Sequence, residues 1–172
     1  NVMPDEQKFD GPGIIMEDVV SLANAAANSE RYSNMGVYKF VDITDEELEI
    51  QFAAVTFLLP DTTVFISFRG TDNTLVGWKE DFNMCFIDGI PSQLEAAKYV
   101  NAIAQEIDMP LRLGGHSKGG NLSIWASAHL NTKHKQRIIN IYSNDAPGFN
   151  ESFLNASIYL EIREKISSFV PE

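Results

Sequence analysis

The amino-acid sequence predicts an α/β fold in which a mixed, mostly parallel sheet is flanked by helices. From Ser92 onward, helix-like and strand-like patterns alternate, and this order is typical of a parallel sheet with helices on its faces. Two β-rich runs before Ser92 are joined by a turn-forming sequence, which predicts antiparallel strands at one edge. The chain has 172 residues, 44% of them hydrophobic, with no repeat or linker. We therefore expect one domain over residues 1–172 with a buried core.

The first part of the chain predicts one helix and three strands. Residues 18–27 form a helical pattern with an apolar stripe made of Val19, Leu22, Ala23 and Ala26. Residues 37–41 predict a short strand, and residues 52–59 and 63–68 are β-rich runs. The tripeptide Pro60-Asp61-Thr62 separates these two runs, so we expect them to pair as a hairpin.

The second part of the chain supplies the alternating helices and strands. Ser92 and Glu95 match a capping box, which predicts the start of a helix that ends before Pro110. The pattern then predicts a strand at 111–114, a helix at about 119–130, a strand at 137–143, a helical or irregular stretch at 151–164 and a strand at 166–170. Successive strands are thus connected through helices, as a parallel sheet requires.

Composition excludes several classes of partner. The formal net charge is -11 and no cluster of Lys and Arg stands out, so we expect neither nucleic acid nor an anionic membrane surface as a partner. The longest apolar run, residues 52–59, is too short to span a bilayer. The single cysteine, Cys85, cannot form an internal disulfide, which favours a reducing, cytoplasmic location. The three histidines and this cysteine lack metal-ligand spacing, so no metal site is expected.

One short motif predicts a nucleophile. The run Gly115-His116-Ser117-Lys118-Gly119 is G-x-S-x-G, placed between a predicted strand and a predicted helix. A serine at such a sharp turn adopts strained dihedrals, and small neighbours two positions away avoid a clash with it. The helix start below it offers N–H groups for a developing oxyanion. The alternative is a glycine-rich turn that binds phosphate, although the pattern matches neither common phosphate-binding fingerprint.

A second motif points to a family. Residues 64–83 are VFISFRGTDNTLVGWKEDFN. Together with GHSKGG, this segment resembles the class 3 (fungal-type) lipases, which carry F-R-G-[ST] at a strand end followed by W-x-x-D. The likeness is closer still to a bacterial branch of α/β-hydrolases whose elbow has the sequence G-H-S-K-G-G. The resemblance extends from about residue 55 to residue 170 and implies an α/β-hydrolase fold.

The resemblance assigns roles to individual residues. Ser117 would be the acyl-accepting nucleophile, and Thr71 and the backbone N–H of Lys118 would form the oxyanion hole. Residues 72–78 match a segment that can act as a lid in this family; an ordinary core role is the alternative. Arg69 is expected to form a structural ion pair with Asp81. The Lys118 side chain departs from the usual apolar residue, and we expect it to pair with an acidic neighbour rather than with a substrate carboxylate.

The general base is missing from the sequence. None of the three histidines follows the chain order nucleophile, acid, histidine. His116 lies inside the elbow, where we expect it to pack, and His134 is expected in a solvated turn. His129 follows Ser117 by twelve residues along a predicted helix, which places it roughly 18 Å away.

The sequence offers two candidates for the acid that orients the histidine. By resemblance it follows the strand at 166–170, which makes Glu172 the tentative acid and leaves Asp145 as the alternative. We therefore expect the fold to be C-terminally incomplete, with the histidine farther downstream.

These observations predict a serine hydrolase that cleaves carboxylic esters, small or lipid-like, through an acyl-enzyme on Ser117. An enzyme of this type needs no cofactor, which is again an implication of the resemblance. Two alternatives remain open from the sequence alone. The missing histidine would suit a catalytically inactive α/β-hydrolase scaffold that acts as a binding module, and the turn at residues 115–120 would suit a phosphate-binding protein.

Overall fold

The computed structural model describes residues 16–71, 75–84, 86–87 and 89–171. The chain divides into two compact units, residues 1–34 and 35–172. In the first unit, the predicted helix is α1 (Met16–Ala27), and it ends in a turn in which the Ser29 hydroxyl donates to the Ala26 carbonyl at 2.7 Å. The expectation of one domain over residues 1–172 stays a prediction.

The second unit is built on one six-stranded sheet, and its topology confirms the predicted fold class. Strand order follows the sequence, with β1–β2 and β2–β3 antiparallel and all pairs from β3 to β6 parallel. The strands are β1 (Gly36–Asp45), β2 (Ile50–Leu58), β3 (Val64–Phe68), β4 (Leu111–His116), β5 (Ile138–Asn144) and β6 (Ile166–Phe169).

The turn between β2 and β3 has the predicted hairpin chemistry. Asp61 accepts hydrogen bonds from the backbone N–H of Thr63 at 3.1 Å and from its hydroxyl at 2.6 Å. Thr62 adopts a φ of 61°, and its N–H donates to the Leu59 carbonyl. An aspartate that binds the backbone two residues later is a common way to close a tight turn.

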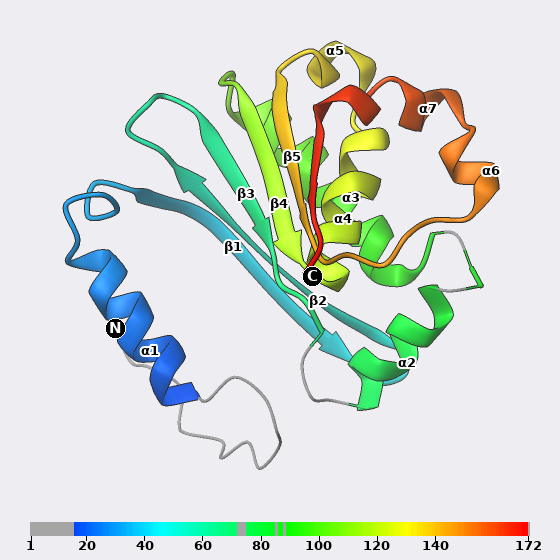
Figure 1. Ribbon diagram of the computed structural model, residues 1–172, viewed down its shortest axis with the longest axis horizontal. Coiled ribbons are helices and arrows are strands. Elements are labelled where there is room, and N and C mark those ends of the chain that lie inside the picture. The colour runs from blue at the N-terminus through cyan, green and yellow to red at the C-terminus, as the bar shows by residue number, and fades with distance from the viewer. Residues whose placement is uncertain (1–15, 72–74, 85, 88, 172) are drawn as a thin grey trace. The chain divides into compact units, whose positions relative to one another are not determined.

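Helices cover one face of the sheet and close the connections between strands. They are α2 (Leu75–Met84), α3 (Pro91–Glu106), α4 (Lys118–Ala128), α5 (Thr132–Lys135), α6 (Glu151–Leu154), α7 (Ser157–Leu160) and the 3-10 helix η1 (Arg163–Lys165). Figure 1 shows α3 and α4 side by side behind the parallel strands. Alternate strand residues point toward them, so Ile66 of β3, Leu113 of β4 and Val100 of α3 are fully buried in one core.

The start of α3 differs from the predicted capping box. The helix begins at Pro91, and the Gln93 side chain accepts hydrogen bonds from the N–H groups of Gly89 (2.9 Å) and Ile90 (3.1 Å). Proline is pre-organised for the first helical position, so the cap falls on Ile90 and Ser92 already lies inside the helix. The Ser92–Glu95 box is therefore wrong.

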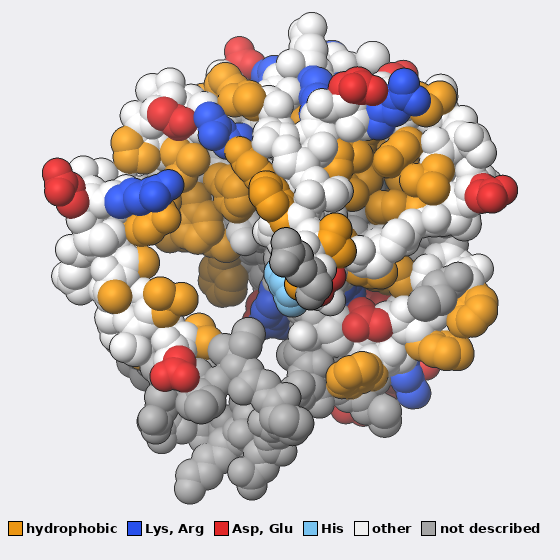
Figure 2. Space-filling view, in the orientation of Figure 1, with side chains coloured by type: hydrophobic (Ala, Val, Ile, Leu, Met, Phe, Trp, Pro, Cys, Tyr) orange, Lys and Arg blue, Asp and Glu red, His pale blue; other side chains and the backbone are white. Residues whose placement is uncertain are grey.

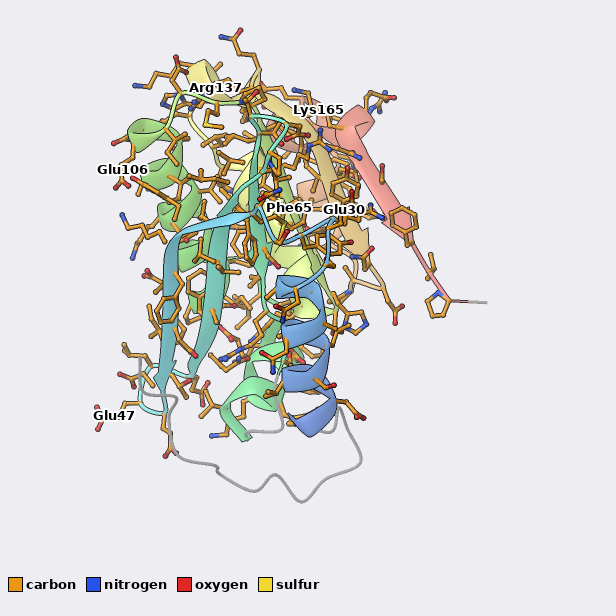
Figure 3. The ribbon with its side chains drawn as sticks, turned by 90° about the vertical axis from the view of Figure 1, so that its left-hand side faces the viewer. Glu30, Glu47, Phe65, Glu106, Arg137 and Lys165 are labelled. Atoms are coloured by element: carbon orange, nitrogen blue, oxygen red, sulfur yellow. The ribbon has the colours of Figure 1, made fainter. Side chains whose placement is uncertain are left out.

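Half-buried cations bind backbone carbonyls where the parallel strands begin. Lys165 Nζ donates to the carbonyls of Lys135 (3.1 Å) and Ile138 (2.8 Å), and Arg137 Nη1 donates to that of Ile107 at 2.6 Å. Figure 3 shows Arg137 and Lys165 at this same end of the sheet. His134 is half-buried with Nδ1 2.7 Å from Arg137, and desolvation lowers its pKa, so the expected solvated turn is wrong.

Among the described helices, none combines the length and the apolar character that crossing a bilayer would require.

Candidate active site at the carboxyl ends of the parallel strands

The carboxyl ends of β3, β4, β5 and β6 meet at one edge of the sheet. The pairing aligns Phe68 with Gly115, His116 with Asn144, and Asn144 with Phe169. In Figure 1, β6 accordingly ends beside the arrowheads of β4 and β5. The segments that follow β3, β4 and β5 carry Thr71, Ser117 and Asp145, so the fold brings these three residues to the same edge of the sheet. Ligand sites of open parallel sheets lie at this edge.

Ser117 occupies a strained turn between β4 and α4. Its φ is 54° and its ψ is −127°, a conformation that costs a non-glycine residue roughly 1–3 kcal/mol. The turn is held by the Ser117 N–H, which donates to the Asn144 carbonyl at 2.9 Å, and by the Ser117 carbonyl, which accepts from Gly120 N–H at 2.9 Å. This is the sharp strand-to-helix bend that the G-x-S-x-G pattern predicts.

The glycines of the elbow are needed because β3 passes directly against it. A Cβ placed on Gly115 would lie 2.6 Å from the Phe68 carbonyl oxygen. A Cβ on Gly119 would overlap the same oxygen and lie 2.9 Å from the Phe68 carbonyl carbon. Only glycine leaves room for this approach of α4 to the end of β3.

Gly70 brings the two sequence motifs into contact. A Cβ placed on Gly70 would lie 3.7 Å from the Ser117 Cβ and 2.8 Å from the His116 carbonyl oxygen. Thr71 follows directly, so its backbone lies next to the elbow. Neither the Thr71 N–H nor the Lys118 N–H donates to any of the described residues. Two backbone N–H groups next to the elbow thus have no acceptor among the described residues, and the 11-residue helix α4 begins directly after Ser117.

The side chain of Thr71 is held by Asp81 of α2. Its hydroxyl lies 2.6 Å from both carboxylate oxygens of Asp81 and donates to them. Asp81 is half-buried, and desolvation raises the pKa of its carboxyl, although the hydrogen bond from Thr71 and the charge of Lys118 act in the opposite direction.

The expected Arg69–Asp81 ion pair is wrong. Both Nη atoms of Arg69 bind the carboxylate of Asp42 at 3.0 Å. The reason is strand register: the Arg69 N–H donates to the Ala53 carbonyl, and Ala53 pairs with Asp42 across β1 and β2.

The Lys118 side chain is fully buried and paired. Its Nζ lies 2.9 Å from Glu80 Oε2, 2.7 Å from the Gln51 carbonyl and 2.6 Å from Gln51 Oε1. Lys118 is 1% exposed and Glu80 is 0% exposed. The predicted pairing with an acidic neighbour is confirmed. Sequence reasoning did not identify Glu80 or Gln51. The one sequence signal for a buried partner was Lys118 itself, a cation at a position where the lipases that the chain resembles usually have an apolar residue.

None of the described histidines is hydrogen-bonded to Ser117. His116 is exposed at the end of β4, so the expected packing role is wrong. His129 follows α4, with Nδ1 2.9 Å from the Trp125 carbonyl and its ring stacked on Trp125 at 4.2 Å between centroids. Within the described part of the chain, no hydrogen bond reaches the Ser117 hydroxyl.

The two candidate acids differ in what the structure shows. Asp145 follows β5 with a φ of 49°, is exposed, and donates its N–H to the Phe169 carbonyl at 2.7 Å. Asp145 therefore lies next to the elbow, because the preceding residue, Asn144, accepts a hydrogen bond from the Ser117 N–H. Glu172 lies outside the described residues. Its role and that of Asp145 stay predictions.

The segment predicted as a lid is only partly described. Residues 72–74 lie outside the described residues; Val76 is buried, and Trp78 is 63% exposed. Figure 2 shows hydrophobic side chains gathered over α2 and the segment after it, where Phe82, Phe86 and Ile87 are exposed. A shallow hollow of about 350 Å³ here is lined by Glu49, Trp78, Lys79, Phe82 and Asn83, and includes none of the elbow residues.

Comparisons with solved structures agree with this architecture. The lipase of a fungal lipase–inhibitor complex superposes with a TM-score of 0.61 at 14% identity, over 89% of this chain and 64% of that one. The Rhizomucor miehei lipase in its propeptide complex gives a TM-score of 0.56 at 15% identity, over 88% of this chain and 55% of that lipase. The chain thus spans less than two thirds of either lipase, and the likeness confirms a lipase-like α/β-hydrolase fold. The closer likeness to the bacterial branch stays a prediction.

The comparison with curated proteins gives no match. A family model described as Mbeg1-like matches residues 26–172, which include the strand end at Arg69-Gly70, the elbow and β6. Because this match covers most of the sequence, the chain belongs to the Mbeg1-like family.

Proposed function

We propose that this protein is a serine hydrolase that cleaves carboxylic esters, small or lipid-like, through an acyl-enzyme on Ser117. The observation that carries the proposal is the strained φ of 54° at Ser117, beside two N–H groups that have no acceptor among the described residues. Strained backbone conformations of this kind cluster at active sites and ligand-binding sites.

The proposed mechanism gives each group a step. Ser117 Oγ attacks the ester carbonyl carbon, and the carbonyl oxygen becomes an oxyanion. The N–H groups of Thr71 and Lys118 would stabilise that oxyanion, because both residues adjoin the elbow and neither N–H has an acceptor among the described residues. The base that takes the Ser117 proton passes it to the leaving alkoxide as the tetrahedral intermediate collapses, so that the alcohol departs and the acyl group stays on Ser117. Water, deprotonated by the same base, then attacks the acyl carbon, which releases the acid and restores the Ser117 hydroxyl.

Attack by Ser117 requires a base that takes the proton of its hydroxyl. None of the described histidines lies in hydrogen-bonding contact with Ser117 Oγ. We propose an imidazole that reaches the elbow at the carboxyl ends of β5 and β6. Its orienting acid would be Glu172 or Asp145, since β6 ends at Phe169 beside Asn144.

The test is covalent labelling of the full-length protein with a fluorophosphonate, followed by peptide mapping. We expect one adduct on Ser117, turnover of p-nitrophenyl esters, and loss of both in Ser117→Ala, which removes only the hydroxyl. Asn150→Ala is a control, because the Asn150 side chain binds Ser152 and Phe153 of α6, and it should label like the wild type. Absence of labelling in a folded protein would refute the proposal and favour the binding-module alternative.

A further inference from the structure

We infer that Lys118 is a positioning residue whose buried ion pair with Glu80 fixes α2 and, through Asp81, sets the place of Thr71 relative to Ser117. This inference rests on the proposed function and adds the part of the protein that keeps the oxyanion donors in register.

The ion pair is costly, and that cost calls for an explanation. Lys118 and Glu80 are both fully buried, at 1% and 0% exposure. Buried ion pairs add little stability compared with apolar side chains of similar volume, because desolvation offsets the attraction between the charges. Two apolar residues in place of Lys118 and Glu80 would avoid this cost. A directional pair there gives the chain something that apolar contact does not, namely a defined distance between two elements.

Glu80 joins three elements to the elbow. Its Oε2 accepts from Lys118 Nζ at 2.9 Å and from the Gln51 N–H of β2 at 3.2 Å. Its Oε1 accepts from the Ser92 N–H in the first turn of α3 at 2.8 Å. All the donors belong to buried groups, so water does not compete for these bonds.

Other side-chain contacts of α2, with the residue before β2, lie nearer the surface. Lys79 and Asn83 each bind Glu49 at 3.4 Å, and the side chains of Lys79 and Glu49 are 53% and 44% exposed. Glu80 is fully buried, so its contacts tie α2 to the core. The next residue is Asp81, which holds the Thr71 hydroxyl at 2.6 Å. A shift of α2 would consequently carry Thr71 with it.

Lys118 thus controls both donors of the proposed oxyanion hole. Its own N–H is one of them, and its side chain fixes the helix that positions the other. The test replaces Lys118 with Met, which keeps the backbone N–H and the length of the side chain but leaves Glu80 without its cation. The matched control is Lys135→Met, because Lys135 also forms a short ion pair, 2.6 Å from Glu161, with only 11% of its side chain exposed.

The measured quantities are the fluorophosphonate labelling rate of Ser117 per folded molecule, and kcat and KM for a p-nitrophenyl ester. We expect Lys118→Met to lower the labelling rate and kcat on the order of 10- to 100-fold with little change in KM, because displaced donors weaken transition-state binding. Lys135→Met should stay within about twofold of the wild type. An unchanged labelling rate per folded Lys118→Met molecule would overturn the inference.

Two further measurements keep the inference testable if a variant or the proposed function fails. If Lys118→Met does not fold, Glu80→Gln keeps the shape and an acceptor for Ser92, and it should show a smaller loss of the same kind. If wild-type protein is not labelled, the proposed function fails, and amide exchange tests the positioning alone. Exchange over residues 75–84 should then accelerate in Lys118→Met but not in Lys135→Met; equal exchange would refute the role of Lys118.

Discussion

The two ends of the parallel strands treat polar groups in opposite ways. At the amino end, Lys165 and Arg137 donate to backbone carbonyls, and Lys135 pairs with the half-exposed Glu161. At the carboxyl end, Ser117 is strained, and the N–H groups of Thr71 and Lys118 have no acceptor in the part of the chain that the structure describes. At the amino end, side-chain cations thus bind backbone carbonyls, whereas at the carboxyl end two backbone N–H groups next to the elbow have no acceptor among the described residues.

The carboxylates show the same contrast. At the amino end, hydrogen bonds from Thr63 and Lys39 lower the pKa values of Asp61 and Glu106. At the carboxyl end, burial raises the pKa of Asp81. A carboxyl with a lowered pKa favours folding as an anion, whereas one with a raised pKa opposes folding as an anion. Ionised Asp81 at the carboxyl end therefore lowers the free energy of unfolding, whereas ionised Asp61 and Glu106 at the amino end raise it.

The largest expected effect comes from filling the gap between α4 and β3. Gly119→Ala would place its Cβ against the Phe68 carbonyl, and this overlap should cost about 3 kcal/mol of unfolding free energy. The gain in helix propensity, about 1 kcal/mol, is too small to compensate. The matched control is Gly148→Ala, because a Cβ there meets nothing within 4 Å. Urea unfolding should separate the two variants; equal stabilities would show that the close approach is not required.

A smaller effect of opposite sign should follow from relieving the strain at the elbow. Ser117→Gly should raise the unfolding free energy by about 1 kcal/mol, because the relief of an unfavourable φ exceeds the added entropy of the unfolded chain. Thr62→Gly is the control at the amino end, where φ is 61°. Both variants should melt higher, but only Ser117→Gly should lose fluorophosphonate labelling. A Ser117→Gly variant that is less stable than the wild type would contradict the strain argument.

The fold was predictable because its signals are local. Two β-rich runs identify β2 and β3, the turn at Asp61 identifies their hairpin, and each later strand follows a helical pattern. The elbow was predictable for the same reason, since glycines, strand and helix are contiguous in the sequence. The predicted cap of α3 was wrong because Pro91 takes the first helical position, which moves the N-cap to Ile90.

The partners of the charged residues were not predictable, because they come from distant segments. Lys118 meets Gln51 and Glu80, which lie 67 and 38 residues away in the sequence. Arg69 meets Asp42 because of the register between β1 and β2, which no local pattern encodes. Asp81 was the nearer candidate for Arg69 in the sequence, but in the fold it binds Thr71. Ion pairs at a site thus depend on topology, whereas the nucleophile turn depends on its own few residues.

The smallest expected effect is a difference in pH dependence between the two ends. The raised pKa of Asp81 means that the folded chain binds this proton more readily than the unfolded chain does, so wild type should gain stability relative to Asp81→Asn as pH falls through the folded pKa. The lowered pKa of Asp61 has the opposite sign, so wild type should lose its advantage over Asp61→Asn on acidification. Urea unfolding between about pH 7 and pH 4 measures both differences. Slopes of the same sign would mean that the Thr71 hydrogen bond and the Lys118 charge outweigh the burial of Asp81, and the proposed contrast between the two ends would not hold for their carboxylates.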